Sequence, residues 1–218
     1  MTSGGKDSTL ALDRARRDGL QVTCCVNLFE GTTRRVRFHG VRHQLIKLQA
    51  KALGLELLQA STHPPDFETA FVRLLEQLKS RGFDGVVFGN VHLQDVRAWY
   101  EKRVSSAGLE HVEPLWGAPP IEIAWEVVER GYHSLVVSVD LARPAAGMLA
   151  REFDADLVTE IGVTEDLDPL GEQGEYHTFV YDGPAFSDPV VFTIGEQLEL
   201  EGHRFVDLVP GNGSAPEF

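Results

Sequence analysis

The stretch S-G-G-K-D-S, residues 3–8, stands directly before a helical run from Thr9 to Arg17. Its two glycines let the backbone curl so that several N–H groups point at one anion, and the N-terminus of the following helix adds partial positive charge. We therefore predict a phosphate-binding loop. A Walker A loop does not fit, because that pattern needs Ser or Thr after the lysine and another glycine upstream, whereas Asp7 follows Lys6 here.

The composition is that of a globular chain, with 218 residues, 43% of them apolar, and a formal charge of −13. That length allows one large domain or two small ones. No apolar run is long enough to span a membrane, and no secretory pattern is present, which favours a cytoplasmic protein. Its acidity disfavours nucleic acid as a partner. Cys24 and Cys25 adjoin within an apolar run, where side chains alternate faces, so we expect two separate core residues.

Short β-branched runs alternate with longer helical ones in the first half of the chain, which predicts a parallel sheet covered by crossover helices. We expect strands at 22–29, 56–60 and 85–89. Between them, apolar residues recur at helical spacing in 41–52 and 67–78. The fold class is therefore α/β, with a parallel-sheet domain and a smaller C-terminal α/β lobe.

The proline-rich segment 114–120 interrupts this periodicity and predicts a domain boundary near Gly117. We expect a first domain at 1–117 that carries the phosphate loop, a second domain at 118–210 and a mobile tail at 211–218. Only Met1 and Thr2 precede the phosphate loop, where a strand of about five residues is usual. Either the start site is assigned too late, or the chain is truncated before that strand, or the loop is supported in another way.

A polar cluster at 89–101, G-N-V-H-L-Q-D-V-R-A-W-Y-E, follows a predicted strand. Ligands of open parallel sheets lie at the carboxyl ends of strands, so Asn90, Asp95 and Arg97 should face the same crevice as the loop. Otherwise the cluster is a solvated helix start with Trp99 packed beneath it.

These residues suggest roles toward phosphate and magnesium. Lys6 and Arg97 would neutralise phosphate charge, while Asp7 or Asp95 would hold Mg²⁺ through carboxylate oxygens or water.

A second polar cluster at 168–178, D-P-L-G-E-Q-G-E-Y-H-T, contains two glycines and two glutamates within five residues. Such a loop does not build a core and is typical of a substrate-facing element. Glu172 or Glu175 would act as general base toward an amine nucleophile, with His177 as partner or acid. The alternative is an ordinary hairpin with a satisfied histidine.

These motifs together carry a resemblance to a known family. The loop at 3–8 resembles the pyrophosphate (PP) loop of the ATP pyrophosphatase superfamily. With the segments 38–40, 89–101, 113–117 and 171–178, it occurs in the order typical of the diphthine–ammonia ligase family.

The resemblance implies an N-terminal domain of the adenine nucleotide α hydrolase type and an ATP-dependent, AMP-forming amidation. A carboxylate, either diphthine on an elongation factor or an unidentified small molecule, would be adenylated and then attacked by ammonia. It implies no nucleic acid or membrane partner and leaves a homodimer open. The expected catalytic residues are Lys6, Asp7, Glu172, Glu175 and His177, with Asp7 on Mg²⁺. The expected nucleotide-binding residues are Ser3, Gly4, Gly5, Lys6, Ser8, His39, Gly89, Asn90, Asp95 and Arg97.

Two other functions stay open. A nucleotide sensor with this fold would bind ATP without turnover. An RNA-thiolating pyrophosphatase would need a sulfur-carrying cysteine at the site and a basic surface, and the charge of −13 argues against the second requirement.

Overall fold

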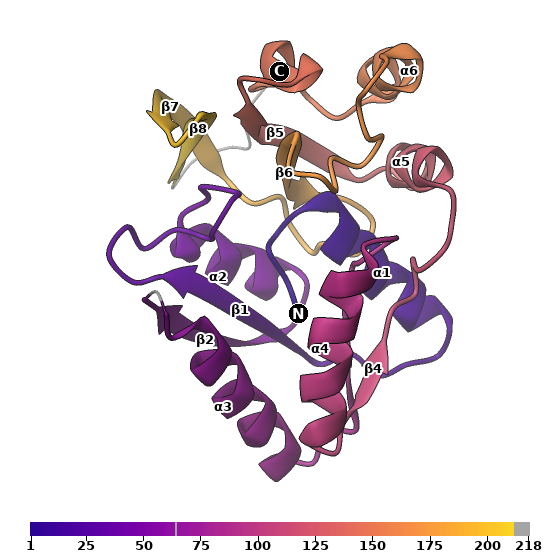
Figure 1. Cartoon of the computed structure of the whole chain (residues 1–218), viewed down its shortest axis with the longest axis vertical. Helices are drawn as coiled ribbons and strands as arrows, with labels where there is room; N and C mark the ends of the chain where they lie inside the picture. Colours follow the sequence, from indigo (N-terminus) through magenta and orange to yellow (C-terminus); the bar gives the residue numbers. More distant parts are fainter. Residues whose placement is uncertain (64, 212–218) are drawn as a thin grey trace.

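The computed structural model describes residues 1–63 and 65–211, so the predicted tail lies outside the described residues except for Gly211. Helices and strands alternate through the first half of the chain, and an antiparallel sheet follows (Figure 1). In chain order the elements are α1 (Lys6–Arg17), β1 (Cys24–Glu30), α2 (His43–Ala52), β2 (Glu56–Thr62), α3 (Phe67–Ser80), β3 (Gly85–Val87), α4 (Gln94–Ser106), β4 (Glu110–Val112), α5 (Pro120–Glu129), β5 (His133–Asp140), the 3₁₀ helix η1 (Pro144–Met148), α6 (Ala155–Val163), β6 (Tyr176–Asp182), β7 (Phe192–Leu200) and β8 (His203–Pro210).

The strands of the first half pair in parallel, as predicted, but they form two separate pairs. β1 pairs with β2, in a register that places Cys24 opposite Glu56, and β3 pairs with β4. The expectation of one continuous hydrogen-bonded parallel sheet was therefore wrong. The buried stripe of α3, centred on Phe71 and Leu75, packs with residues of both pairs in one hydrophobic cluster and bridges them.

The gap between the two pairs is crossed by the first two residues. The Met1 amine donates to Val87 O at 2.5 Å, and Thr2 N donates to Val26 O at 2.8 Å. Met1 and Thr2 thus contact β3 and β1 respectively, the place where a strand leading into the loop would lie. Each of these residues makes one of these backbone hydrogen bonds to a different strand, so together they link the two pairs.

Adding four apolar, β-branched residues before Met1 is expected to stabilise the fold, because they would continue the hydrogen bonding between β1 and β3. For a chain of this size, each kcal/mol gained raises the melting temperature by about 2–4 °C. Melting and ATP titration calorimetry should both report the gain. Four Gly-Ser residues at the same place serve as the control, and equal melting of the two extended forms would contradict the prediction.

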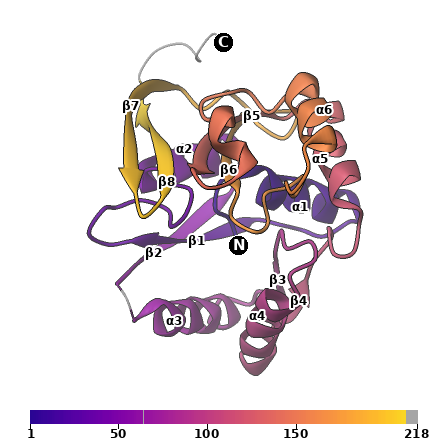
Figure 2. The same cartoon turned by 45° about the horizontal axis from the view of Figure 1, so that its top comes forward.

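The C-terminal half builds a four-stranded antiparallel sheet in the order β6-β5-β8-β7 (Figure 2). Every β5 residue between His133 and Asp140 is buried. β7 is exposed along nearly its whole length, although apolar residues alternate along it at Phe192, Ile194, Leu198 and Leu200.

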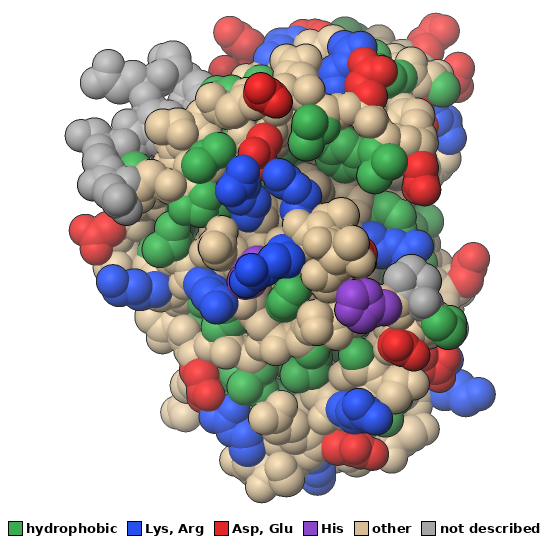
Figure 3. Space-filling view, turned by 90° about the vertical axis from the view of Figure 1, so that its left-hand side faces the viewer, with side chains coloured by type: hydrophobic (Ala, Val, Ile, Leu, Met, Phe, Trp, Pro, Cys, Tyr) green, Lys and Arg blue, Asp and Glu red, His purple; other side chains and the backbone are tan. Residues whose placement is uncertain are grey.

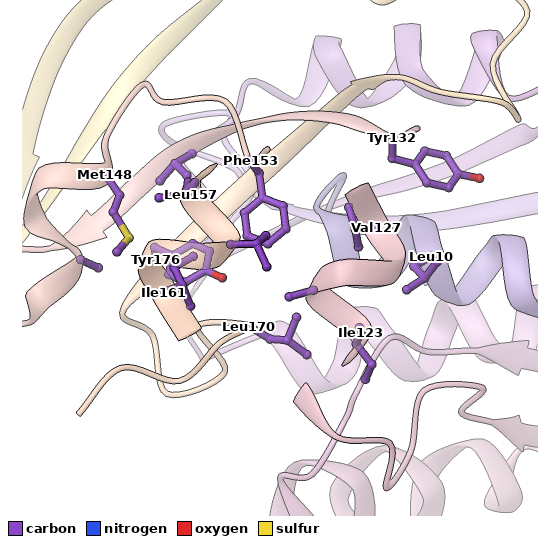
Figure 4. Close-up of a cluster of buried hydrophobic side chains, with 14 of the residues drawn as sticks. Leu10, Ile123, Val127, Tyr132, Met148, Phe153, Leu157, Ile161, Leu170 and Tyr176 are labelled. Carbon is purple, nitrogen blue, oxygen red and sulfur yellow. The ribbon is translucent and has the colours of Figure 1, made fainter. Parts of the chain in front are cut away.

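Both halves of the chain contribute to the same hydrophobic cores. Leu10 of α1 lies in one buried cluster with Ile123 and Val127 of α5 and with Phe153 and Tyr176 (Figure 4). A second cluster combines residues of α2 with residues of β5, β6 and β8. The division at Gly117 stays a prediction, and the structure joins the two sides of it by continuous apolar packing.

Two sequence expectations can be compared directly with the structure. Cys24 and Cys25 are free thiols, one half-buried and one buried, as predicted. None of the described helices has the length and apolar character needed to cross a bilayer.

Candidate active site at the phosphate loop

The loop at 3–8 is held in place by β6. The carbonyl of Gly4 accepts a hydrogen bond from Val180 N at 2.9 Å, and Lys6 N donates to Thr178 Oγ1 at 3.0 Å. Gly4 has a φ of +86°, and a Cβ there would lie 2.6 Å from a side-chain atom of α2. Both the conformation and the close approach require glycine. The two motifs that are farthest apart in the sequence are therefore in direct contact.

A cleft with a volume of about 720 Å³ opens beside the loop and the first turn of α1. Its wall combines the loop, the turn after β1, the start of α4 and the 168–178 loop. Aromatic side chains of α3 and α4, together with Phe88 just after β3, form part of the wall. Of the expected site residues, those that line the cleft are Ser3, Asp7, Ser8, His39, Gly89, Asn90, Asp95, Glu172 and His177.

Lys6 lies outside the residues that line this cleft. Its side chain is only 2% exposed, and Nζ donates to Leu170 O at 2.5 Å and pairs with Asp7 Oδ2 at 3.2 Å. Nζ also lies 4.7 Å from the centre of the Tyr176 ring. In this arrangement the lysine joins the loop to the 168–178 segment and holds Asp7, so the predicted phosphate contact of Lys6 stays a prediction.

Two carboxylates of the cleft influence each other. Burial, reinforced by the charge of Asp7, raises the pKa of Glu172 to about 7. Burial also raises the pKa of Asp7, and Lys6 opposes this rise. Glu172 therefore titrates near neutral pH, which is the property expected of a general base.

The environment of Asp7 fits a magnesium ion that also binds phosphate. Its Oδ1 atom is buried and has no hydrogen-bond partner among the described residues. The described residues contain no group of three or more His, Cys, Asp or Glu side chains that could hold a metal by itself. Mg²⁺ commonly uses one or two carboxylates and completes its shell with water and substrate phosphates.

Two histidine rings lie against each other, tilted by 34°, on one side of the cleft. His39 and His177 have ring centroids 4.5 Å apart, and His39 Nδ1 lies 3.0 Å from Thr178 O. Burial lowers the pKa of His39 to about 4 and that of His177 well below its usual value. Both rings are neutral at pH 7, which favours a hydrogen-bonding role for His177 over that of an acid.

Glu113 holds two side chains of the polar cluster at 89–101. Its carboxylate accepts a hydrogen bond from Asn90 Nδ2 at 2.5 Å and lies 3.2 Å from Arg97 Nε. The Arg97 guanidinium stacks over Trp116 at 4.3 Å from the ring centre. Arg97 is therefore held by a buried carboxylate and an aromatic ring and, unlike Asn90, does not line the cleft.

Glu175 is also outside the cleft lining. It is 1% exposed, and its two carboxylate oxygens accept hydrogen bonds from Gln173 N at 3.0 Å and Asp168 N at 3.3 Å. These contacts brace the 168–178 loop. We therefore base the general-base proposal on Glu172 and assign Glu175 to holding that loop.

Asp168 and His92 lie behind the cleft wall as a pair to which the sequence patterns assigned no role, and neither lines the cleft. His92 Nε2 lies 3.2 Å from Asp168 Oδ2, and the charge of Asp168 adds to the pKa rises of both Asp7 and Glu172. Asp168 is the first residue of the 168–178 motif, and Glu113 is the first residue of the 113–117 motif. These positions were the sequence signal that could have pointed to the two residues. Their partners lie far away in the sequence, so spacing could not reveal the contacts.

Replacing Gly89 with Ala is expected to displace the phosphate loop. A Cβ at Gly89 would lie 2.7 Å from the backbone carbon of Asp7 and 2.8 Å from Ser8 N. We expect a loss of about 1–3 kcal/mol in stability and weaker ATP binding. Melting and calorimetry test this. Gly147→Ala is the matched control because its Cβ would meet open space, and equal behaviour of the two variants would contradict the prediction.

Neither cysteine is among the described residues that line the cleft. Cys24 and Cys25 lie instead along β1, beside Met1 and Val87. This observation disfavours sulfur transfer by either thiol at the candidate site.

Comparisons with known proteins agree with the motifs. Residues 1–111 match the model of the diphthamide synthase N-terminal domain, and residues 119–205 match that of the C-terminal domain. The diphthine–ammonia ligase of Schizosaccharomyces pombe is 25% identical over 91% of this chain and 36% of its own length. The corresponding proteins of Rattus norvegicus and Danio rerio are 23% and 24% identical, with 87% of each covered.

The chain thus spans 36% of the length of the fission-yeast relative and most of the length of the two vertebrate ones. These relatives are named as ligases, which confirms the predicted family and the predicted class of enzyme. The two domain matches together cover most of the sequence, and the chain belongs to the diphthamide synthase family.

Proposed function

We propose that this chain is an ATP-dependent amide ligase that adenylates a carboxylate, releases pyrophosphate and transfers ammonia to the adenylate. The observation that carries the proposal is that one cleft is lined by both the phosphate loop and the acidic 168–178 loop. ATP and the acceptor could then meet at the reacting phosphorus. The relatives are named diphthine–ammonia ligases, which supports both ammonia and a diphthine-containing acceptor.

The phosphates of ATP would lie at the N-terminus of α1. Ser3 and Ser8 offer hydroxyl groups there, and the first turn of the helix leaves backbone N–H groups free of intrahelical acceptors. Asp7, with Asp95 nearby on the cleft wall, would hold Mg²⁺. When bound, the ion would neutralise charge on the phosphates. This use of the loop fits a domain of the adenine nucleotide α hydrolase type.

Glu172 would take a proton from the attacking amine. Its pKa of about 7 makes it largely ionised just above neutral pH, where the carboxylate can accept that proton. His177 would orient the acceptor or the amine as a neutral hydrogen-bond partner. Asn90, held by Glu113, would act on the nucleotide side.

Product analysis is the primary test. Incubation with ATP, ammonia and candidate carboxylates should yield AMP and pyrophosphate, and the yield should depend on the acceptor. ADP and orthophosphate would rule out the proposal. ATP binding without AMP release for every acceptor would favour the sensor, and AMP release that requires RNA and a sulfur donor would favour thiolation.

A further inference from the structure

One segment of this acidic chain carries only positive charge. Between Gly31 and Leu55 there is no Asp or Glu, although the whole chain has 33 acidic and 20 basic residues. We call the surface formed by the basic residues of this segment the basic face. These residues are Arg34, Arg35, Arg37, Arg42, Lys47 and Lys51.

The fold leaves much of this charge unneutralised. Arg35 and Arg42 both pair with Asp207, at 2.8 and 2.6 Å. The other four are exposed, and within the described part of the chain none of them has a carboxylate partner. On the side of the molecule that carries α2 and the β7–β8 hairpin, Lys and Arg side chains gather near the centre, while acidic ones lie mostly toward the edge (Figure 3).

A groove with a volume of about 590 Å³ runs along this face between α2 and β2. Lys47 and Lys51 line it, and no carboxylate does so among the described residues. His43, also in the groove wall, is 5% exposed, and its ring stacks on Phe29 with 4.6 Å between the ring centroids. The groove therefore offers the cationic groups of Lys47 and Lys51 to an anionic side chain.

The basic face continues into the cleft. Arg37 is exposed and lines the cleft, and so does Phe38, which stacks beneath its guanidinium at 4.9 Å. Phe38 is 62% exposed and has a φ of +66°, an uncommon conformation for a bulky residue. A partner bound on the basic face would thus reach the wall of the candidate active site.

We propose that the basic face docks an acidic surface of the protein that carries the acceptor carboxylate. This inference rests on the proposed function, because it supplies the route by which a protein-borne acceptor enters the cleft. Opposite charges would steer the encounter and fix the orientation of the acceptor. A folded acidic patch suits this small face better than a long polyanion, which would extend onto a chain of net charge −13.

A direct binding measurement tests whether the basic face binds an acidic partner, and it does not depend on catalysis. A short fluorescein-labelled oligo-glutamate peptide should bind the full chain, and added salt should weaken the complex. Lys47→Glu with Lys51→Glu should weaken binding about tenfold. The matched control is Arg73→Glu with Lys102→Glu, an equal charge change on exposed residues of α3 and α4. Equal binding by both double variants, or tighter binding of a labelled DNA duplex than of the peptide, would overturn the proposal.

Steady-state kinetics then test whether the acceptor protein uses the basic face. With a diphthine-bearing protein as substrate, the basic-face variant should show a KM for that protein raised about tenfold, with kcat and ATP affinity close to those of the parent. An unchanged KM would overturn the docking role. If the parent forms no AMP with any acceptor, the proposed function fails, whereas the peptide measurement still decides whether the basic face binds an acidic partner.

Discussion

Glu172→Gln should lower the rate of amide formation by about 10²–10⁴-fold while ATP affinity stays within a few-fold of the parent. The amide of Gln keeps the shape of the side chain but cannot accept the proton of an attacking amine. General bases typically accelerate a reaction by a factor of about 10²–10⁴. Single-turnover formation of the amide, with ATP binding measured by calorimetry, would check both parts.

The pH dependence gives this prediction a second readout. A base with a pKa of about 7 is protonated and inactive below that pH, so the kcat of the parent should rise as pH increases through 7. Glu172→Gln should lack that rise. Glu129→Gln, the same change at an exposed residue of α5, is the control and should keep it. A Glu172→Gln variant with parental activity and the parental pH profile would exclude the base role.

Lys6→Met should lower the free energy of unfolding by about 3–5 kcal/mol. Removing one partner of a buried ion pair leaves the other charge uncompensated. Here the loss of the ammonium would leave Asp7 without its partner and Leu170 O without its donor. Urea denaturation measures the effect, and loss of loop order should also weaken ATP binding.

Adding Asp7→Asn to Lys6→Met should recover part of that loss, because it removes the unpaired charge. Lys102→Met, at an exposed position on α4, should change stability by no more than about 0.5 kcal/mol. A Lys6→Met effect as small as that of the control would show that the buried contacts of Lys6 contribute little to the fold.

Local patterns in the sequence were enough to predict the phosphate loop, most of the regular elements in the first half and the family. The loop signal depends on adjacent residues, because glycine conformation and the helix N-terminus act within a few positions. The stripes of α2 and α3 were predicted because burial of one helix face leaves a 3.6-residue period. β7 was not predicted, although apolar residues alternate along it at 192, 194, 198 and 200, and the structure leaves all of its residues after Phe192 exposed.

Only the tertiary structure decided how the chemical groups meet. It brings Thr178 and Leu170 onto the Lys6 segment and turns the lysine toward the C-terminal loop. It also separates Glu172, in the cleft, from Glu175, which braces the loop, although the two lie in one short motif. These outcomes depend on contacts between residues far apart in the chain. Local periodicity carries no information about such contacts, since they arise from the packing of one element against another.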